Sequence, residues 1–122
     1  MRFVIAMQTS QRGGFWRWPE TATERLRQEF PELEIEELGQ PSDLPPPGPE
    51  TLLKAAEAAV AVRLHPEWLR AAPKLRWLHC PSAAVHQLLT PELIASPVQV
   101  TNGAGVHAAS VAEHGLALLL AL

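Results

Sequence analysis

The chain has 122 residues, of which 47% are hydrophobic and 19% are charged, and these values are typical of one folded domain rather than of a disordered segment. Its formal net charge of -3 provides no basic surface, so the composition excludes nucleic acid and anionic membranes as expected partners. A single cysteine, Cys80, excludes an internal disulfide framework and favours a reducing compartment. The apolar runs at residues 3–7 and 115–122 are too short for a signal sequence or a membrane span. We therefore expect a soluble cytoplasmic protein.

Short apolar runs alternate along the chain with helical patterns. Residues 3–7 lack polar alternation, which predicts a strand buried on both faces. Pro19 suits the first turn of a helix, Pro31 ends that helix, and the five prolines of residues 39–49 exclude regular structure. In chain order, we predict a strand at residues 3–7, a helix from Pro19 to residue 30, a strand at 33–38, a short helix at 50–57, a strand at 59–64, a helix at 66–72, a strand at 75–80, a helix that follows the turn at 81–84 and breaks at Thr90 and Pro91, a strand at 98–101, and a last helix at 106–122.

Five strands that alternate with five helical segments predict an α/β domain, a flavodoxin-like, doubly wound, five-stranded parallel sheet. Ligands of such sheets bind beyond the carboxyl ends of the strands, near the point where the strand order reverses. The loops expected at that edge are residues 8–17, 64–67, 81–86 and 102–107.

Small side chains fill the turn after the fourth predicted strand, where Cys80-Pro81 is followed by Ser82, Ala83, Ala84 and Val85. Small residues between a strand and a helix let backbone N–H groups face outward, where the helix dipole favours an anion such as a carboxylate. The same residues suit a tight turn that binds nothing. The local sequence leaves both interpretations open.

Arg63 ends an otherwise apolar strand, which predicts a guanidinium at the carboxyl edge of the sheet. In that place it could bind a carboxylate through two parallel hydrogen bonds. An arginine in solvent, or one paired with Glu67, fits the sequence equally well.

The five histidines do not predict a metal site, because neither HExxH nor paired CxxC motifs occur. The glycine-bearing loop at residues 8–14 lacks the spacing and the lysine of a phosphate-binding loop. It nevertheless supplies an alternative hypothesis, a freestanding flavodoxin-like module that binds FMN or a phosphate. Residues 102–107 contain two glycines but no complete dinucleotide fingerprint, and they are interpreted as a cap of the last helix.

Three stretches resemble the D-isomer-specific 2-hydroxyacid dehydrogenase family. Residues 71–78 (AAPKLRWL) resemble the entry to its fourth strand, and residues 82–86 (SAAVH) resemble its substrate loop. Residues 100–121, with TNG, VHA and VAEH followed by LALLLA, resemble its linker helix. The resemblance covers residues 58–122 well, whereas residues 1–57 match only in pattern.

The resemblance implies hydride transfer between a nicotinamide cofactor, NAD or NADP, and a small 2-keto or 2-hydroxy acid. The amides of residues 82–85 would hold the substrate carboxylate, Arg63 matches a frequently polar position beside it, and Val111 matches a position near the nicotinamide. The catalytic arginine, glutamate and histidine of the family lie outside the matched stretches. No catalytic residue is therefore assigned, and whether this chain is itself an enzyme stays open.

The resemblance also divides the chain into a substrate-binding domain, residues 1–105, and the start of a linker helix, residues 106–122, to an absent NAD-binding Rossmann domain. The last residues lack a helix stop signal, which indicates truncation at a domain boundary. We expect a fragment that is inactive alone, binds no cofactor and forms a homodimer or swapped assembly through residues 106–122. Two positions depart from the family: Ala84 replaces a glycine, which matters if the turn needs a positive φ, and His86 replaces an aspartate.

Overall fold

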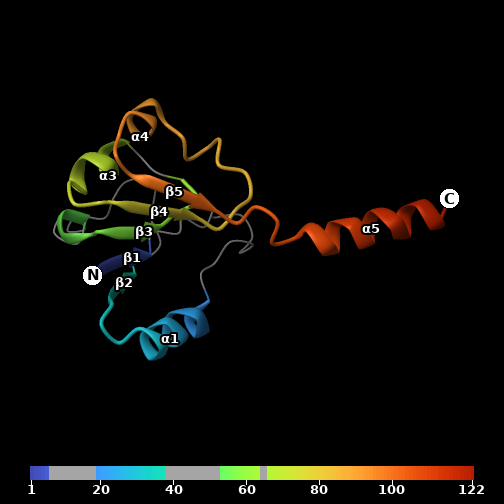
Figure 1. Cartoon of the computed structure of the whole chain (residues 1–122), viewed down its shortest axis with the longest axis horizontal. Coiled ribbons are helices and arrows are strands. Elements are labelled where there is room, and N and C mark those ends of the chain that lie inside the picture. The colour runs from blue at the N-terminus through green and yellow to red at the C-terminus, as the bar shows by residue number, and fades with distance from the viewer. Residues whose placement is uncertain (6–18, 38–52, 64–65) are drawn as a thin grey trace.

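A computed structural model describes residues 1–5, 19–37, 53–63 and 66–122. The strands are β1 (Arg2–Ile5), β2 (Glu34–Glu37), β3 (Ala58–Val60), β4 (Trp77–Cys80) and β5 (Gln99–Asn102). The helices are α1 (Glu20–Glu29), α3 (Pro66–Ala71), α4 (Pro91–Ile94) and α5 (Ala108–Leu120) (Figure 1).

The five strands form one sheet in the order β2-β1-β3-β4-β5, and every neighbouring pair is parallel. This is the strand order of flavodoxin-like domains, so the predicted fold class is confirmed. The order reverses between β1 and β3, and the carboxyl ends of all five strands meet at one edge. The loops that follow the strands at that edge are the place to look for a ligand site.

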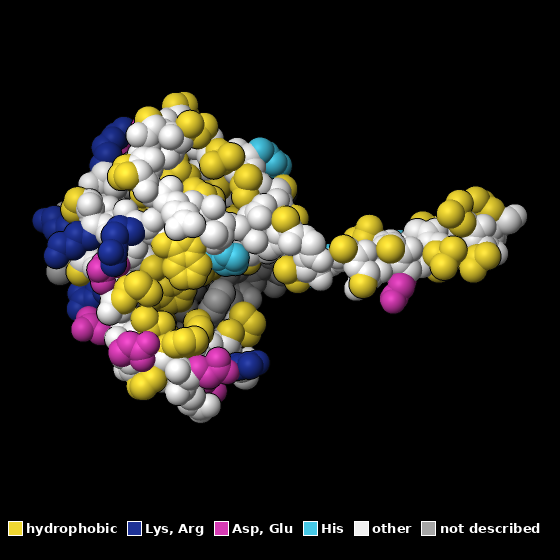
Figure 2. All heavy atoms as spheres, in the orientation of Figure 1, with side chains coloured by type: hydrophobic (Ala, Val, Ile, Leu, Met, Phe, Trp, Pro, Cys, Tyr) yellow, Lys and Arg dark blue, Asp and Glu magenta, His cyan; other side chains and the backbone are white. Residues whose placement is uncertain are grey.

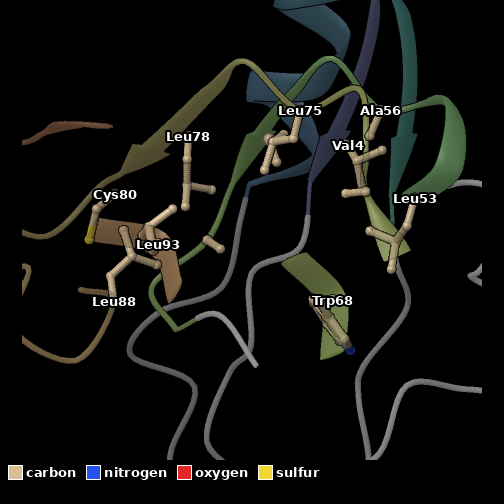
Figure 3. Packing of buried hydrophobic residues seen from close by; sticks show 12 residues of the cluster. Val4, Leu53, Ala56, Trp68, Leu75, Leu78, Cys80, Leu88 and Leu93 are labelled. Atoms are coloured by element: carbon tan, nitrogen blue, oxygen red, sulfur yellow. The ribbon is translucent and has the colours of Figure 1, made fainter. Parts of the chain in front are cut away.

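The larger core lies on one face of the sheet, beneath α3 and α4. Alternation along β4 points Leu78 and Cys80 to this face, and both are fully buried. Trp68 of α3 and Leu93 of α4 pack in the same cluster. Figure 3 shows Leu78, Leu88 and Leu93 gathered beside Cys80. Each large apolar side chain buried in this way contributes about 1.5–3 kcal/mol to folding.

The opposite face carries a smaller cluster. Phe3, Ile35, Ala58 and Val60 are buried there, and Leu26 of α1 packs against them. The α1 helix therefore covers the part of this face that β1 and β2 form. Farther along the same face, the side chains of β4 and β5 are only partly covered.

Two predicted helices differ from the structure. The expected helix up to residue 90 is wrong: residues 86–88 form a turn in which the Val85 carbonyl accepts from the N–H groups of Leu88 and Leu89, at 2.8 and 3.1 Å. Thr90 then starts α4 rather than breaking a helix, because its Oγ1 accepts the Leu93 N–H at 3.2 Å and Pro91 occupies the first turn. Of the helix expected at 50–57, residues 53–55 are helical and 50–52 lie outside the described residues.

The last helix, α5, leaves the sheet after β5 and extends away from it (Figure 1). It begins at Ala108, two residues later than predicted, and none of its residues is buried. Within the described ranges, no helix is long and apolar enough to cross a membrane.

Candidate functional site

The turn after β4 is fastened to the end of β5 through its carbonyl groups. The N–H of Gly103 donates to the carbonyls of Cys80 and Ser82, at 3.0 and 3.3 Å. The side-chain Nδ2 of Asn102 donates to the carbonyl of Ala83 at 2.8 Å. Cys80 and Asn102 are paired across β4 and β5, so the strand register itself brings the two segments together.

This fastening sets the direction of the amides, since a trans peptide points its N–H opposite to its C=O. The described residues contain no cis peptide, and the carbonyls of Ser82 and Ala83 face the end of β5. The N–H groups that follow these carbonyls, those of Ala83 and Ala84, therefore point away from β5. The Ala84 N–H donates to Ser82 Oγ at 3.3 Å. The N–H groups of Ser82, Ala83 and Val85 make no hydrogen bond to any residue that the structure describes.

The turn is also accessible. Ala83 and Ala84 are exposed, while Ser82 and Val85 are half-buried. No non-glycine residue in the described ranges has a positive φ, so Ala84 adopts its conformation without backbone strain. The turn therefore does not require at Ala84 the left-handed conformation that favours glycine. His86, the second departure, is exposed immediately after it.

Arg63 lies near the turn and does not pair with Glu67, the partner considered from the sequence. Its Nε donates to Oε1 of Gln87 at 2.9 Å, and Gln87 is two residues beyond Val85. No ion pair between Arg63 and Glu67 occurs in the described part of the chain. The side chain is exposed, so an anionic ligand can reach its guanidinium group.

Val111 is not part of this arrangement. It lies on α5, where 68% of the side chain is exposed, and α5 extends away from the sheet. The structure therefore brings together the turn 82–85, its β5 contacts and, through Gln87, Arg63, whereas Val111 stays apart.

From the sequence alone, Asn102 and Gly103 belong to a loop at the ligand-binding edge and are interpreted as a cap of the last helix, but their contacts with the turn after β4 are not predicted. Gly103 is buried, and a Cβ added there would lie 2.4 Å from the carbonyl oxygen of Pro81, so no larger residue fits without a shift of backbone. An asparagine and a glycine directly after a predicted strand are the signal that could have pointed to this contact.

Other candidate sites receive no support from the described residues. The loop at 8–14, on which the FMN or phosphate alternative depends, lies outside them, as do residues 64 and 65. No group of three or more His, Cys, Asp or Glu side chains in the described ranges could hold a metal ion.

Comparison with known proteins shows that this chain is similar in fold to two solved structures. No protein-family model matches the sequence, and no curated protein matches it significantly. A D-lactate dehydrogenase from Aquifex aeolicus, complexed with NAD and lactic acid, is similar with a TM-score of 0.71 and 21% identity, over 100% of this chain and 33% of that one. A D-lactate dehydrogenase from Treponema pallidum is similar with a TM-score of 0.67 and 21% identity, over 98% of this chain and 35% of that one. The chain thus has a fold found in D-lactate dehydrogenases and spans about a third of their length.

Proposed function

We propose that this chain is the substrate-binding domain of a dehydrogenase that acts on 2-hydroxy and 2-keto acids. The observation that carries the proposal is the turn 82–85, in which the carbonyls of Ser82 and Ala83 bond to Gly103 and Asn102 and the N–H groups of Ala83 and Val85 make no hydrogen bond to the described residues. Backbone amides that are fixed before a ligand arrives bind a carboxylate through charge-assisted hydrogen bonds. The likeness in fold to two D-lactate dehydrogenases supports the same assignment.

The role of the chain would be to bind and orient. The amides of the turn would hold the two carboxylate oxygens, and Arg63, exposed and tethered by Gln87, would add a positive charge beside them. When the carboxylate of a substrate is held, the adjacent carbonyl carbon is fixed in position. It can then be oriented toward the group that transfers the hydride. A nicotinamide cofactor, NAD or NADP, would supply the hydride.

We propose that the cofactor is held by a Rossmann domain that is not among these 122 residues. Residues 1–105 would be the substrate domain and residues 106–122 would begin the connection to the cofactor domain, with Val111 close to the nicotinamide. The chain by itself would then bind the acid weakly and transfer no hydride. The single buried cysteine, Cys80, supports a reducing, cytoplasmic location for such an enzyme.

The proposal is tested by titrating the ¹⁵N-labelled chain with pyruvate and following the amide resonances of residues 82–85. We expect saturable shifts of these resonances, with a dissociation constant on the order of millimolar for so small a ligand. Methyl pyruvate, which lacks the charged carboxylate, should leave them unmoved. The idea fails if pyruvate does not shift these amides, or if methyl pyruvate shifts them equally.

Two arginine variants separate a local contact from general charge. Arg63→Gln should weaken pyruvate binding about 2- to 5-fold, the loss expected for one solvent-exposed charged contact. Arg70→Gln removes the same charge from the last turn of α3 and should bind as the wild type does. Oxidation of NADH by the isolated chain in the presence of pyruvate would contradict the division of labour between two domains.

We also propose that the 122-residue chain self-associates through residues 106–122. The support is the exposure of five large apolar side chains within α5, since apolar patches of this kind drive association.

A further inference from the structure

Gln87 joins the end of β3 to the segment that follows the turn 82–85. Its Oε1 accepts the Nε–H of Arg63 at 2.9 Å, across 24 residues of sequence. Because an arginine Nε can only donate, this contact also fixes the orientation of the Gln87 amide, with its oxygen toward Arg63. Both side chains are exposed, so small ligands in solvent can reach the pair.

The backbone on both sides of Gln87 is anchored. The Val85 carbonyl accepts the N–H groups of Leu88 and Leu89, at 2.8 and 3.1 Å. Leu88 is fully buried, beside Cys80 in the larger core (Figure 3). A side chain on a backbone that is already ordered loses less conformational freedom when it makes a hydrogen bond. Gln87 therefore links Arg63 to Val85, the last residue of the turn.

Arg63 differs from three other arginines in the charge of its partner. Arg2, Arg25 and Arg76 each donate to a glutamate carboxylate, at 2.6, 2.6 and 3.0 Å. Arg63 donates to a neutral amide, and it forms no ion pair with any residue in the described ranges. Its two terminal nitrogens make no hydrogen bond to the described part of the chain. Its full positive charge, and the fork that these two nitrogens form, are therefore available to a ligand.

Other positive charges gather at the opposite end of the sheet. Most of the Lys and Arg side chains visible in Figure 2 lie at the end of the sheet away from α5. Arg2 begins β1 and Arg76 precedes β4, so both lie at the amino ends of the strands. A four-residue strand is about 13 Å long, which exceeds the Debye length of about 10 Å at 0.1 M salt. These charges therefore act only weakly on an anion at the turn 82–85, whereas Arg63 lies at the same end of the sheet as the turn.

We propose that Gln87 is a positioning residue of the acid-binding site, which orients the Arg63 guanidinium and leaves its charge uncompensated. The inference rests on the proposed function and adds the residue through which Arg63 becomes selective for an anion. The tether occupies Nε, so the guanidinium binds a carboxylate through its two terminal nitrogens rather than through Nε. A glutamate in place of Gln87 would hold the guanidinium equally well but would neutralise it. The binding of a charged acid thus depends on a neutral acceptor at this position.

Two substitutions of Gln87 separate charge from position in pyruvate titrations of the ¹⁵N-labelled chain. Gln87→Glu keeps an acceptor for Arg63 and adds a negative charge, so it should weaken pyruvate binding about 2- to 5-fold, as much as Arg63→Gln. This difference from the wild type should shrink at 1 M KCl, where the Debye length is about 3 Å. Gln87→Met keeps the positive charge but removes the acceptor, and it should weaken binding by about 2-fold. Gln28→Glu is the matched control, since Gln28 is exposed on α1, and it should bind pyruvate as the wild type does.

The Nε–H resonance of Arg63 reports the tether itself. It should be sharp and protected from exchange with water in the wild type and in Gln87→Glu, and it should exchange rapidly in Gln87→Met. In the Arg63→Gln background, Gln87→Met should cause no further loss of pyruvate affinity, because Gln87 acts only through Arg63. A merely structural role of Gln87 would instead weaken binding in both backgrounds and would shift the amides of residues 82–85 before any ligand is added.

The outcomes distinguish this inference from the proposed function. Wild-type affinity in Gln87→Glu at low salt, or an equal loss in Gln28→Glu, would overturn the inference while pyruvate still shifts the turn amides of the wild type. A loss from Gln87→Met that persists without Arg63 would overturn it as well. If pyruvate leaves the turn amides of the wild type unmoved, the proposed function fails and this inference fails with it.

Discussion

Gly103 offers the sharpest structural prediction, because the space for its side chain is already taken. Its N–H binds the carbonyls of Cys80 and Ser82, and a Cβ in Gly103→Ala would lie 2.4 Å from the Pro81 carbonyl oxygen and 3.1 Å from the Pro81 carbonyl carbon. Cβ contacts below 3.0 Å are essentially not observed, so the two segments must separate by at least 0.6 Å, the difference between 3.0 and 2.4 Å. Both clashing atoms are backbone, and no side-chain rotation can relieve them.

Overpacking of this kind costs about 1–3 kcal/mol. For a domain of this size each kcal/mol lowers the unfolding temperature by about 3–6 °C, so Gly103→Ala should unfold roughly 3–18 °C below the wild type. The same shift stretches the hydrogen bonds that orient the turn at residues 82–85. The amide resonances of these residues should therefore move, and pyruvate should bind more weakly.

Differential scanning calorimetry and amide NMR spectra measure the two effects. Gly115→Ala is the control, because the same methyl group meets nothing within 4 Å on α5. It should leave the unfolding temperature of the sheet domain unchanged, while helicity rises because alanine favours a helix by about 1 kcal/mol over glycine. An unfolding temperature of Gly103→Ala equal to that of the wild type would refute the reasoning.

Three further substitutions test separate contacts. Asn102→Asp replaces the side-chain amide that donates to the Ala83 carbonyl by a carboxylate oxygen, which cannot donate. The amide spectra should then show a displaced turn at residues 82–85, and pyruvate should bind more weakly. An unchanged affinity would argue against a role of Asn102 in orienting the turn. Thr90→Ala removes the hydroxyl that caps α4 and should lower the free energy of unfolding in urea by about 1 kcal/mol, and no loss would mean that the cap is unimportant. The Arg2 guanidinium, 2.6 Å from the Glu34 carboxylate, lowers the pKa of Glu34 below its ordinary value. The stabilisation by this ion pair is therefore present above the ordinary pKa of a glutamate and is lost as the pH falls through the lowered pKa of Glu34. Glu34→Gln should be less stable than the wild type at neutral pH and equally stable in acid, as measured by urea unfolding at both pH values. A stability difference that persists in acid would contradict this expectation.

The sheet could be predicted from the sequence because its strands are short apolar runs between clear breaks. The ends of the strands were less predictable: β4 starts at Trp77 and not at residue 75, because its parallel partner β3 starts at Ala58, the residue paired with Trp77. The helix expected before Thr90 contains good helix formers, Gln87 and Leu88 among them, yet only a turn forms there. Local propensity cannot show that Leu88 is committed to the core.

The site was predictable only in part, since it is made of backbone. Small residues indicated where the turn would be, but the direction of its amides depends on carbonyls that are fixed by Asn102 and Gly103 across the sheet. That contact exists because β5 pairs with β4, and the local sequence does not determine which strands pair. The partner of Arg63 escaped prediction for the same reason: Gln87 is 24 residues away and no pattern links the two.

The position of a bound 2-keto acid tests the central claim most directly. In a crystal structure of the chain with pyruvate at saturating concentration, the carboxylate oxygens should lie about 2.7–3.2 Å from the backbone nitrogens of Ala83 and Val85. The Arg63 guanidinium should approach the same carboxylate. Pyruvate bound elsewhere, or a turn at 82–85 whose amides remain in solvent while the acid is present, would contradict the account.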